Sequence, residues 1–359
     1  MTKVELSGVE LSEMSGAVLA ERAPRTDQAR RLAPKPVWLR IAGFSVAIAS
    51  VALCAVALVH QWSSVKASVE NADYALLLWS FVAAAAGMAG LGVLWWRCLK
   101  TFGYGAGLSH TMSWYFAGEL GKYIPGGVWP VLGRGELAYR KGGVSRATGY
   151  ATTLISYAAM CVAAAGVCGA LALVLAVHDQ APTWAWSIVA LLPIGVLVVH
   201  PVVFERVLRG ASRLTRRRLS LVTPPWLRML SLIATAVPTW LLVGLSSVLI
   251  AQALGFDQRP VEIGFAAVSA WIIGFLAVPV PAGAGLRELV FVGLAGLSPG
   301  RAVAVAAGAR LVLLCVDGLG GALALIDIRF RPGAPCSQPT EPLPDTVECE
   351  TSRVACVEE

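Results

Sequence analysis

Four charged residues surround a Pro-Gly-Gly turn in an otherwise very apolar chain, within the stretch GELGKYIPGGVWPVLGRGEL, residues 118–137. They are Glu119, Lys122, Arg134 and Glu136. Gly126 and Gly127 allow the backbone to approach a ligand closely and to adopt a positive φ. Helix ends inside a bilayer carry partial charge, which is positive at the N-terminus and attracts anions. These residue types therefore predict the binding of a phosphate or another anionic head group.

Further charges follow a second break in the chain. The segment PVPAGAG covers residues 279–285, and Arg287 and Glu288 come directly after it, where a basic side chain could meet a lipid phosphate. Arg310 and Asp317 lie seven residues apart in a later apolar run, hence two turns along one helix face. Ionisable residues inside a membrane are functional candidates by default, and a structural ion pair with another helix is the alternative for these two.

The basic residues of the first stretch also have two explanations. Lys122 and Arg134 would be costly if they faced lipid at depth, so each must reach the interface, a carboxylate or an aqueous cleft. Glu119 could neutralise Lys122 along one helix face. Snorkelling to the cytoplasmic head groups is the alternative for both basic residues.

The composition is that of an integral membrane protein. Hydrophobic residues make up 57% of the chain and charged residues 14%, and the mean hydropathy is +0.68, values that exclude an ordinary soluble domain. The net charge of +7 comes mostly from loops between apolar runs, where basic residues set the topology, so nucleic-acid binding is a poor interpretation. The eight cysteines follow no zinc or redox spacing, and we expect no metal and no cofactor.

Apolar runs predict the elements that position the charged residues. Six of them approach the roughly 20 residues that a spanning helix needs. They are 38–61, 74–96, 147–177, 184–203, 229–254 and 301–327. Two further runs, 109–134 and 262–297, are interrupted by proline and glycine, so that their halves are too short to span. The predicted fold is an all-α polytopic membrane protein with about six full spans and two re-entrant or broken helical hairpins; pairs of tilted helices with proline kinks are the alternative to the hairpins.

The positive-inside bias orients these elements. It places residues 1–36 and 331–359 in the cytoplasm as disordered tails, on either side of a transmembrane domain over residues 37–330. The second span, first hairpin and third span then run in the opposite sense to the fifth span, second hairpin and sixth span. Such an inverted repeat with broken elements in matching positions indicates a transport pathway near the bilayer midplane. The abundance of Ala, Gly and Arg favours a bacterial protein, which would lie in the inner membrane.

Two pairs of motifs resemble a known family. GKYIPGGVWPVLGR followed by GVSRATGYA, and AVPVPAGAGLRE followed by SPGRAVAVAAGARLVLL, are similar to the signatures of the lysylphosphatidylglycerol synthase transmembrane-region family, over roughly residues 38–330. The resemblance implies movement of a lipid with an anionic or sugar-bearing head group between leaflets. By position, it assigns Lys122, Tyr123, Pro125, Gly126, Gly127, Trp129 and Arg134 to the first signature, and Pro279, Pro281, Gly283, Gly285, Arg287 and Glu288 to the second. The bifunctional synthases add a soluble aminoacyl-transfer domain, whereas a short polar tail follows here, so we expect no synthesis of the lipid.

Three functions remain open at this point. The first is a flippase-like lipid translocator, which is not an enzyme and whose partner is a phospholipid or a polyprenyl-phosphate-linked glycolipid. No G-x-x-x-x-G-K-[ST] loop occurs, so its energy would come from a gradient or a partner. The second is a scaffold for envelope-biosynthesis enzymes, and the third is a lipid-phosphate-dependent transferase. The candidate substrate-binding residues are Glu119, Lys122, Tyr123, Pro125, Gly126, Gly127, Trp129, Arg134, Pro281, Gly283, Gly285, Arg287, Glu288, Arg310 and Asp317.

Overall fold

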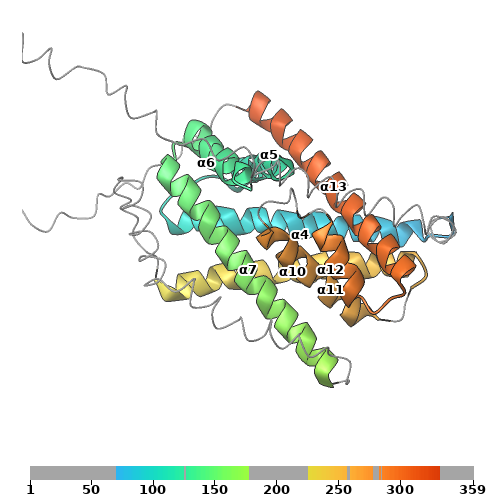
Figure 1. Ribbon diagram of the computed structural model, residues 1–359. Helices are drawn as coiled ribbons and strands as arrows, with labels where there is room; N and C mark the ends of the chain where they lie inside the picture. Colours follow the sequence, from blue (N-terminus) through green and yellow to red (C-terminus); the bar gives the residue numbers. More distant parts are fainter. Residues whose placement is uncertain are drawn as a thin grey trace, which may run out of the picture. The chain divides into compact units, whose positions relative to one another are not determined.

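The structure is a computed structural model that describes residues 70–124, 127–177, 225–256, 259–277, 283 and 285–331 (Figure 1). All of them belong to one compact unit, and every regular element among them is a helix. Several predictions fall outside the described residues. They are the spans 38–61 and 184–203, both tails, and Pro125, Gly126, Pro279 and Pro281.

Four helices are long and apolar enough to cross a membrane. They are α4 (Tyr74–Thr101), α7 (Arg146–Val177), α10 (Trp226–Ala253) and α13 (Pro299–Phe330). Their 28 or 32 residues exceed the roughly 20 that a span requires. Two of these helices begin with standard signals, because the Asp73 carboxylate accepts a hydrogen bond from the Ala75 N–H at 2.8 Å and Pro299 opens α13. Four of the predicted membrane-spanning helices are therefore present.

The two interrupted runs form pairs of shorter helices. The first, hairpin 1, consists of α5 (Leu108–Glu119), the 3₁₀ turn η2 (Leu120–Tyr123) and α6 (Trp129–Gly142). The second, hairpin 2, consists of α11 (Pro260–Leu276) and α12 (Leu286–Leu294). The predicted end of hairpin 1 at residue 134 was too early. After Pro130 in the first turn of α6, no proline or positive-φ glycine interrupts the helix before Gly143, whose φ is +67°.

The arms of each hairpin run antiparallel. In hairpin 1, Gly118 of α5 lies against the backbone of Arg134 of α6. In hairpin 2, Gly274 near the end of α11 lies against the Arg287 side chain, and Glu262 near the start of α11 lies against Gly296 beyond α12. Between the arms, Gly127, Gly283 and Gly285 have φ values of +65°, +65° and +82°. The breaks thus contain conformations that glycine adopts without strain.

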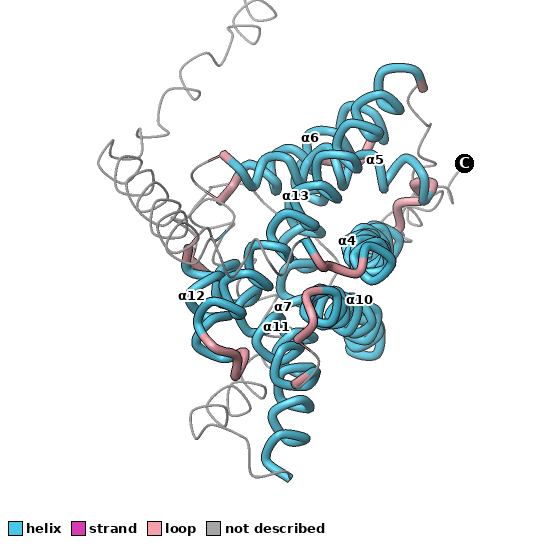
Figure 2. The backbone as a smooth tube through the Cα atoms, turned by 90° about the vertical axis from the view of Figure 1, so that its right-hand side faces the viewer, coloured by secondary structure: helices cyan, strands magenta, loops and turns pink. Residues whose placement is uncertain are grey.

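The long helices α4 and α10 also pack antiparallel, and Figure 2 shows them side by side, viewed nearly along their axes. The Asp73 N–H donates to the Ala253 carbonyl at 2.9 Å at one end, and the Ser80 and Ser246 hydroxyls are 2.9 Å apart further along. A Cβ on Gly87 would lie 3.2 Å from the Thr239 carbonyl oxygen, so the missing side chain allows the close approach.

Helix α13 connects the two hairpins. Its later half packs on α5, where Gly320 and Gly321 accommodate Phe116 and Leu120, and its earlier half faces α12, where Arg310 lies 3.9 Å from Glu288 (Figure 1). This position brings charged residues of α13 next to the breaks of both hairpins.

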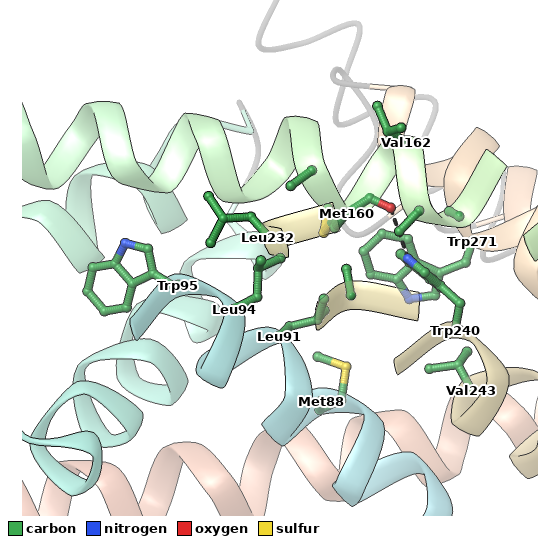
Figure 3. Close-up of a cluster of buried hydrophobic side chains, with 14 of the residues drawn as sticks. Met88, Leu91, Leu94, Trp95, Met160, Val162, Leu232, Trp240, Val243 and Trp271 are labelled. Carbon is green, nitrogen blue, oxygen red and sulfur yellow. Dashed lines mark hydrogen bonds between the residues drawn. The ribbon is translucent and has the colours of Figure 1, made fainter. Parts of the chain in front are cut away.

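A buried apolar cluster fixes the helices that surround the site (Figure 3). Trp240 of α10 donates its indole N–H to the Met160 carbonyl of α7 at 2.9 Å, which satisfies the one polar group of the buried ring. Trp271 of α11 meets Trp240 edge to face, with ring centroids 4.7 Å apart. Met88 and Leu94 of α4 complete the cluster and are each 1% exposed.

The crossing of α6 and α7 depends on two facing glycines, which gives a testable prediction. A Cβ on Gly149 would lie 2.9 Å from the Gly135 Cα and 3.1 Å from its carbonyl oxygen. Because both contacts are to backbone, Gly149→Ala must push the helices apart, and we expect it to lower the unfolding free energy by about 1–3 kcal/mol. Thermal unfolding in detergent measures the change. Gly318→Ala is the control, since nothing lies within 4 Å of that position and helical propensity favours alanine. Equal stabilities for the two variants would contradict the tight crossing.

Candidate functional site

A cavity of about 540 Å³ lies between the two hairpins, with α4 and α7 completing its wall. Hairpin 1 contributes Glu119, Lys122 and Arg134, and hairpin 2 contributes Gly283 and Arg287. Its volume is within the roughly 300–1,000 Å³ of small-molecule sites. Charged residues from two distant parts of the chain thus line one space.

The charges of hairpin 1 are paired. Arg134 forms an ion pair with Glu119, and the two side chains are only 2% and 8% exposed. The Lys122 ammonium lies 3.3 Å from the second Glu119 oxygen and 2.7 Å from Asp317 on α13. The alternative prediction that Arg134 snorkels to the lipid head groups is therefore wrong, and the Lys122 ammonium contacts two carboxylates. The predicted neutralisation of Lys122 by Glu119 is present.

Arg134 is held in a specific way, which we call arginine site 1. Its guanidinium lies 4.1 Å from the centroid of the Tyr115 ring. Its stem crosses α5 at Gly118, where a Cβ would come within 3.0 Å of the Arg134 backbone nitrogen. Arginine site 1 thus consists of Tyr115, Gly118 and Arg134, with the ring three residues before the glycine.

Hairpin 2 has a second arginine site of the same construction, which consists of Trp271, Gly274 and Arg287. The Arg287 guanidinium lies 5.3 Å from the Trp271 ring centroid. Its stem crosses α11 at Gly274, where a Cβ would come within 2.7 Å of the Arg287 Cδ. The ring again stands three residues before the glycine. None of the described carboxylates forms an ion pair with Arg287, although the residue borders the large cavity.

Residues of α13 and α12 join the two sites. Asp317 is 2% exposed, and one of its oxygens accepts a 2.6 Å hydrogen bond from the Tyr123 hydroxyl. Its other oxygen is buried and has no hydrogen-bond partner among the described residues. Glu288 accepts a 2.6 Å hydrogen bond from the Gly285 N–H at the start of α12 and faces Arg310 at 3.9 Å.

Two smaller cavities, of about 40 and 10 Å³, continue the charged region. Arg287 and Arg310 border both of them, Glu288 borders the first, and Asp317 borders the second together with Lys122 and Tyr123. Asp317 and Arg310 thus have the ionic partners that the structural alternative predicted, and they also border cavities.

The remaining candidates differ in position. Gly127 lines the large cavity. Trp129 is 40% exposed and does not line any of the three cavities. A Cβ on Gly121 would lie 2.9 Å from the backbone carbonyl carbon of Trp129. Pro125, Gly126 and Pro281 lie outside the described residues. The Trp129 backbone therefore lies close to Gly121, and its side chain does not line the cavity.

Glu136 also lies apart from the cavity, although it shares the first charged stretch. It is 2.8 Å from Arg140 and 2.8 Å from Arg146, which connects α6 to the start of α7. Hydrogen bonds from Arg146 and then Arg140 lower the pKa of Glu136 to about 2. The carboxylate is therefore ionised at neutral pH, and its ion pair with Arg146 links α6 to α7.

Four aromatic residues that form a wall of the cavity are absent from the residues predicted for the site. They are Tyr115, Tyr157, Trp271 and Phe275, and the Phe275 ring meets the Tyr157 ring edge to face at 5.1 Å. The aromatic-x-x-Gly spacing before each break was a usable signal for Tyr115 and Trp271. Tyr157 lies on α7 and reaches the wall only through the packing of α7 against both hairpins.

Four apolar residues that line the cavity are also exposed, and we call them its apolar rim. They are Val128 and Leu132 of hairpin 1, Leu154 of α7 and Leu276 of hairpin 2. These side chains are 41%, 41%, 56% and 63% exposed. In a membrane helix such residues face acyl chains at little cost.

Comparison with known proteins identifies the family. A search of curated proteins found no match. A family model described as the lysylphosphatidylglycerol synthase TM region matches residues 40–321, which include α4, both hairpins and most of α13. The four membrane-spanning helices agree with a multi-pass membrane protein. The chain therefore belongs to the lysylphosphatidylglycerol synthase transmembrane-region family.

Proposed function

We propose that this protein is a flippase-like translocator that moves a lipid with an anionic or sugar-phosphate head group between membrane leaflets. One observation carries the proposal: a single cavity joins the charged residues of both hairpins to an apolar, exposed rim. A lipid likewise has a polar part and an apolar part, because its head group needs polar partners and its chains favour hydrocarbon. The head group would enter the charged end while the chains leave between Leu132, Leu154 and Leu276.

The proposal includes an inverted repeat with two re-entrant hairpins, for which several features give support. The order of long helix, hairpin and long helix occurs twice, as α4, hairpin 1, α7 and as α10, hairpin 2, α13. Helix α13 packs on α5 of the first set, and α7 packs on α11 of the second, so the two sets exchange their last helices. Inverted repeats in transporters enclose the substrate between matching broken elements.

The proposal also includes the bacterial inner membrane as the location, with both termini in the cytoplasm. The support is the distribution of basic residues in the sequence. The partner is a membrane lipid, either a phospholipid or a polyprenyl-phosphate-linked glycolipid.

The transferase alternative has less support from the cavity. A general base needs a carboxylate that is free to take a proton from the acceptor. Glu119 is engaged by Arg134 and Lys122, Asp317 by Lys122 and Tyr123, and Glu288 by the Gly285 N–H. Nothing on the described surface favours the scaffold alternative over translocation.

Leaflet exchange in vesicles tests the proposal. We expect purified protein to speed the exchange of fluorescent phospholipids, measured by quenching of the outer leaflet, over the rate in protein-free vesicles. Leu154→Trp narrows the apolar rim and should slow exchange several-fold. Leu323→Trp is the matched control, because Leu323 is 68% exposed on α13 and does not line the three cavities.

Two results would count against translocation. Exchange at the protein-free rate with every lipid tested would rule it out. Formation of a product from a lipid-phosphate donor and an acceptor by the purified protein alone would favour the transferase.

A further inference from the structure

The two arginine sites are built alike but differ in one residue. The residue that follows the glycine is Glu119 in arginine site 1 and Phe275 in arginine site 2. Glu119 forms an ion pair with Arg134, so arginine site 1 contains its own anion. Phe275 stacks on Trp271, with ring centroids 5.5 Å apart, and gives Arg287 no charge. Arginine site 2 therefore presents a guanidinium to the cavity without the carboxylate that its counterpart has.

The charges around the cavities add up to a small excess. The side chains of the described residues that line the three cavities include the cations Lys122, Arg134, Arg287 and Arg310 and the carboxylates Glu119, Glu288 and Asp317. Among the described residues that line the cavities, four positive groups against three negative groups leave one positive charge. An uncompensated charge in an apolar protein interior is unfavourable, so this excess among the described lining residues favours a ligand that carries one negative charge.

Arg287 is suited to supply that contact. A guanidinium presents N–H donors in a planar fork that matches two oxygens of a phosphate, and it stacks on aromatic rings at the same time. The Trp271 ring and the space at Gly274 hold the Arg287 side chain against α11, beside the cavity. Little side-chain entropy then remains to be lost when a phosphate binds.

We propose that arginine site 2 binds the phosphodiester of a lipid head group with a net charge of −1, and that the protein selects such lipids over phosphomonoesters and zwitterionic lipids. This inference rests on the proposed translocation. A phosphomonoester carries about −1.5 to −2 charges at neutral pH and would leave an excess of negative charge in the cavity. A zwitterionic head group brings its own cation and leaves the positive excess in place.

A panel of head groups tests the selection with the wild-type protein. Vesicles would contain fluorescent phosphatidylglycerol, phosphatidic acid or phosphatidylcholine, which are a phosphodiester of charge −1, a phosphomonoester and a zwitterion. We expect phosphatidylglycerol to exchange about tenfold faster than the other two, a difference that corresponds to about 1.4 kcal/mol. Similar rates for all three, or a preference for phosphatidic acid, would overturn the selection and leave translocation standing. Exchange of none of them, and of no polyprenyl-phosphate-linked glycolipid added to the panel, would mean that the proposed function itself fails.

Two substitutions test the charge argument directly. Phe275→Glu places a carboxylate where arginine site 1 has Glu119, and we expect it to slow phosphatidylglycerol exchange about tenfold relative to Phe275→Gln, which has the same shape without the charge. Glu288→Gln retains an oxygen for the Gly285 N–H but raises the positive excess to two, so it should shift the preference toward phosphatidic acid. Equal rates for the two Phe275 variants, or an unchanged preference in Glu288→Gln, would contradict the role of net charge.

Discussion

Replacement of Arg134 by methionine is expected to lower the unfolding free energy by about 3–5 kcal/mol, the largest stability loss that we predict for a single substitution. The reason is the burial of its ion pair with Glu119, since the two side chains are 2% and 8% exposed. Without Arg134, the carboxylate of Glu119 is left with Lys122 alone, which Asp317 also engages. Thermal unfolding in detergent measures the loss of stability. The folded fraction at each temperature is the height of the monodisperse peak in size-exclusion chromatography.

Two controls separate the buried pair from a general effect of removing charge. The double variant Arg134→Met, Glu119→Leu removes both charges, and we expect it to regain most of the lost stability. Arg140→Met removes an arginine whose side chain is 70% exposed in its pair with Glu136, and its stability should stay close to that of the wild type. If Arg134→Met were as stable as Arg140→Met, the burial of the pair would not matter.

Replacement of Arg287 by glutamine is expected to reduce lipid exchange about tenfold or more, because a charged hydrogen-bonding partner of a phosphate contributes about 1.5–3 kcal/mol. The same substitution should leave thermal stability unchanged or improved, since Arg287 has no ion-pair partner among the described carboxylates. The rate of leaflet exchange of phosphatidylglycerol measures the first effect, and unfolding in detergent measures the second.

The two substitutions distinguish a structural arginine from a lipid-binding one, because loss of Arg134 should lower stability and loss of Arg287 should lower lipid exchange. Arg301→Gln is the matched control for exchange, because Arg301 is exposed at the start of α13 and lies over the Phe256 ring, away from the three cavities. We expect it to exchange lipid at the wild-type rate. Loss of stability in Arg287→Gln together with unchanged exchange per folded protein would assign Arg287 to the fold alone.

The membrane helices, the positions of the breaks and the family could be predicted from local features of the amino-acid sequence. Apolar runs of sufficient length predicted α4, α7, α10 and α13, because the need to bury backbone polar groups in a bilayer permits few alternatives to a helix. Proline and glycine marked the breaks because both act on the backbone locally. The same local motifs carried the resemblance that the family match over residues 40–321 confirmed.

Which charges are paired and which face the cavity depends on contacts between residues that are far apart in the sequence. The Tyr123 hydroxyl and the Asp317 carboxylate are 194 positions apart in the sequence, and no local rule predicts their contact. Equally, Arg134 and Arg287 look alike in the sequence, each a basic residue after a break. Glu119 pairs with Arg134, whereas the matching position in hairpin 2 is Phe275, which stacks on Trp271. The difference depends on how each second arm folds back across a glycine of the first arm, and that geometry is set by packing between helices.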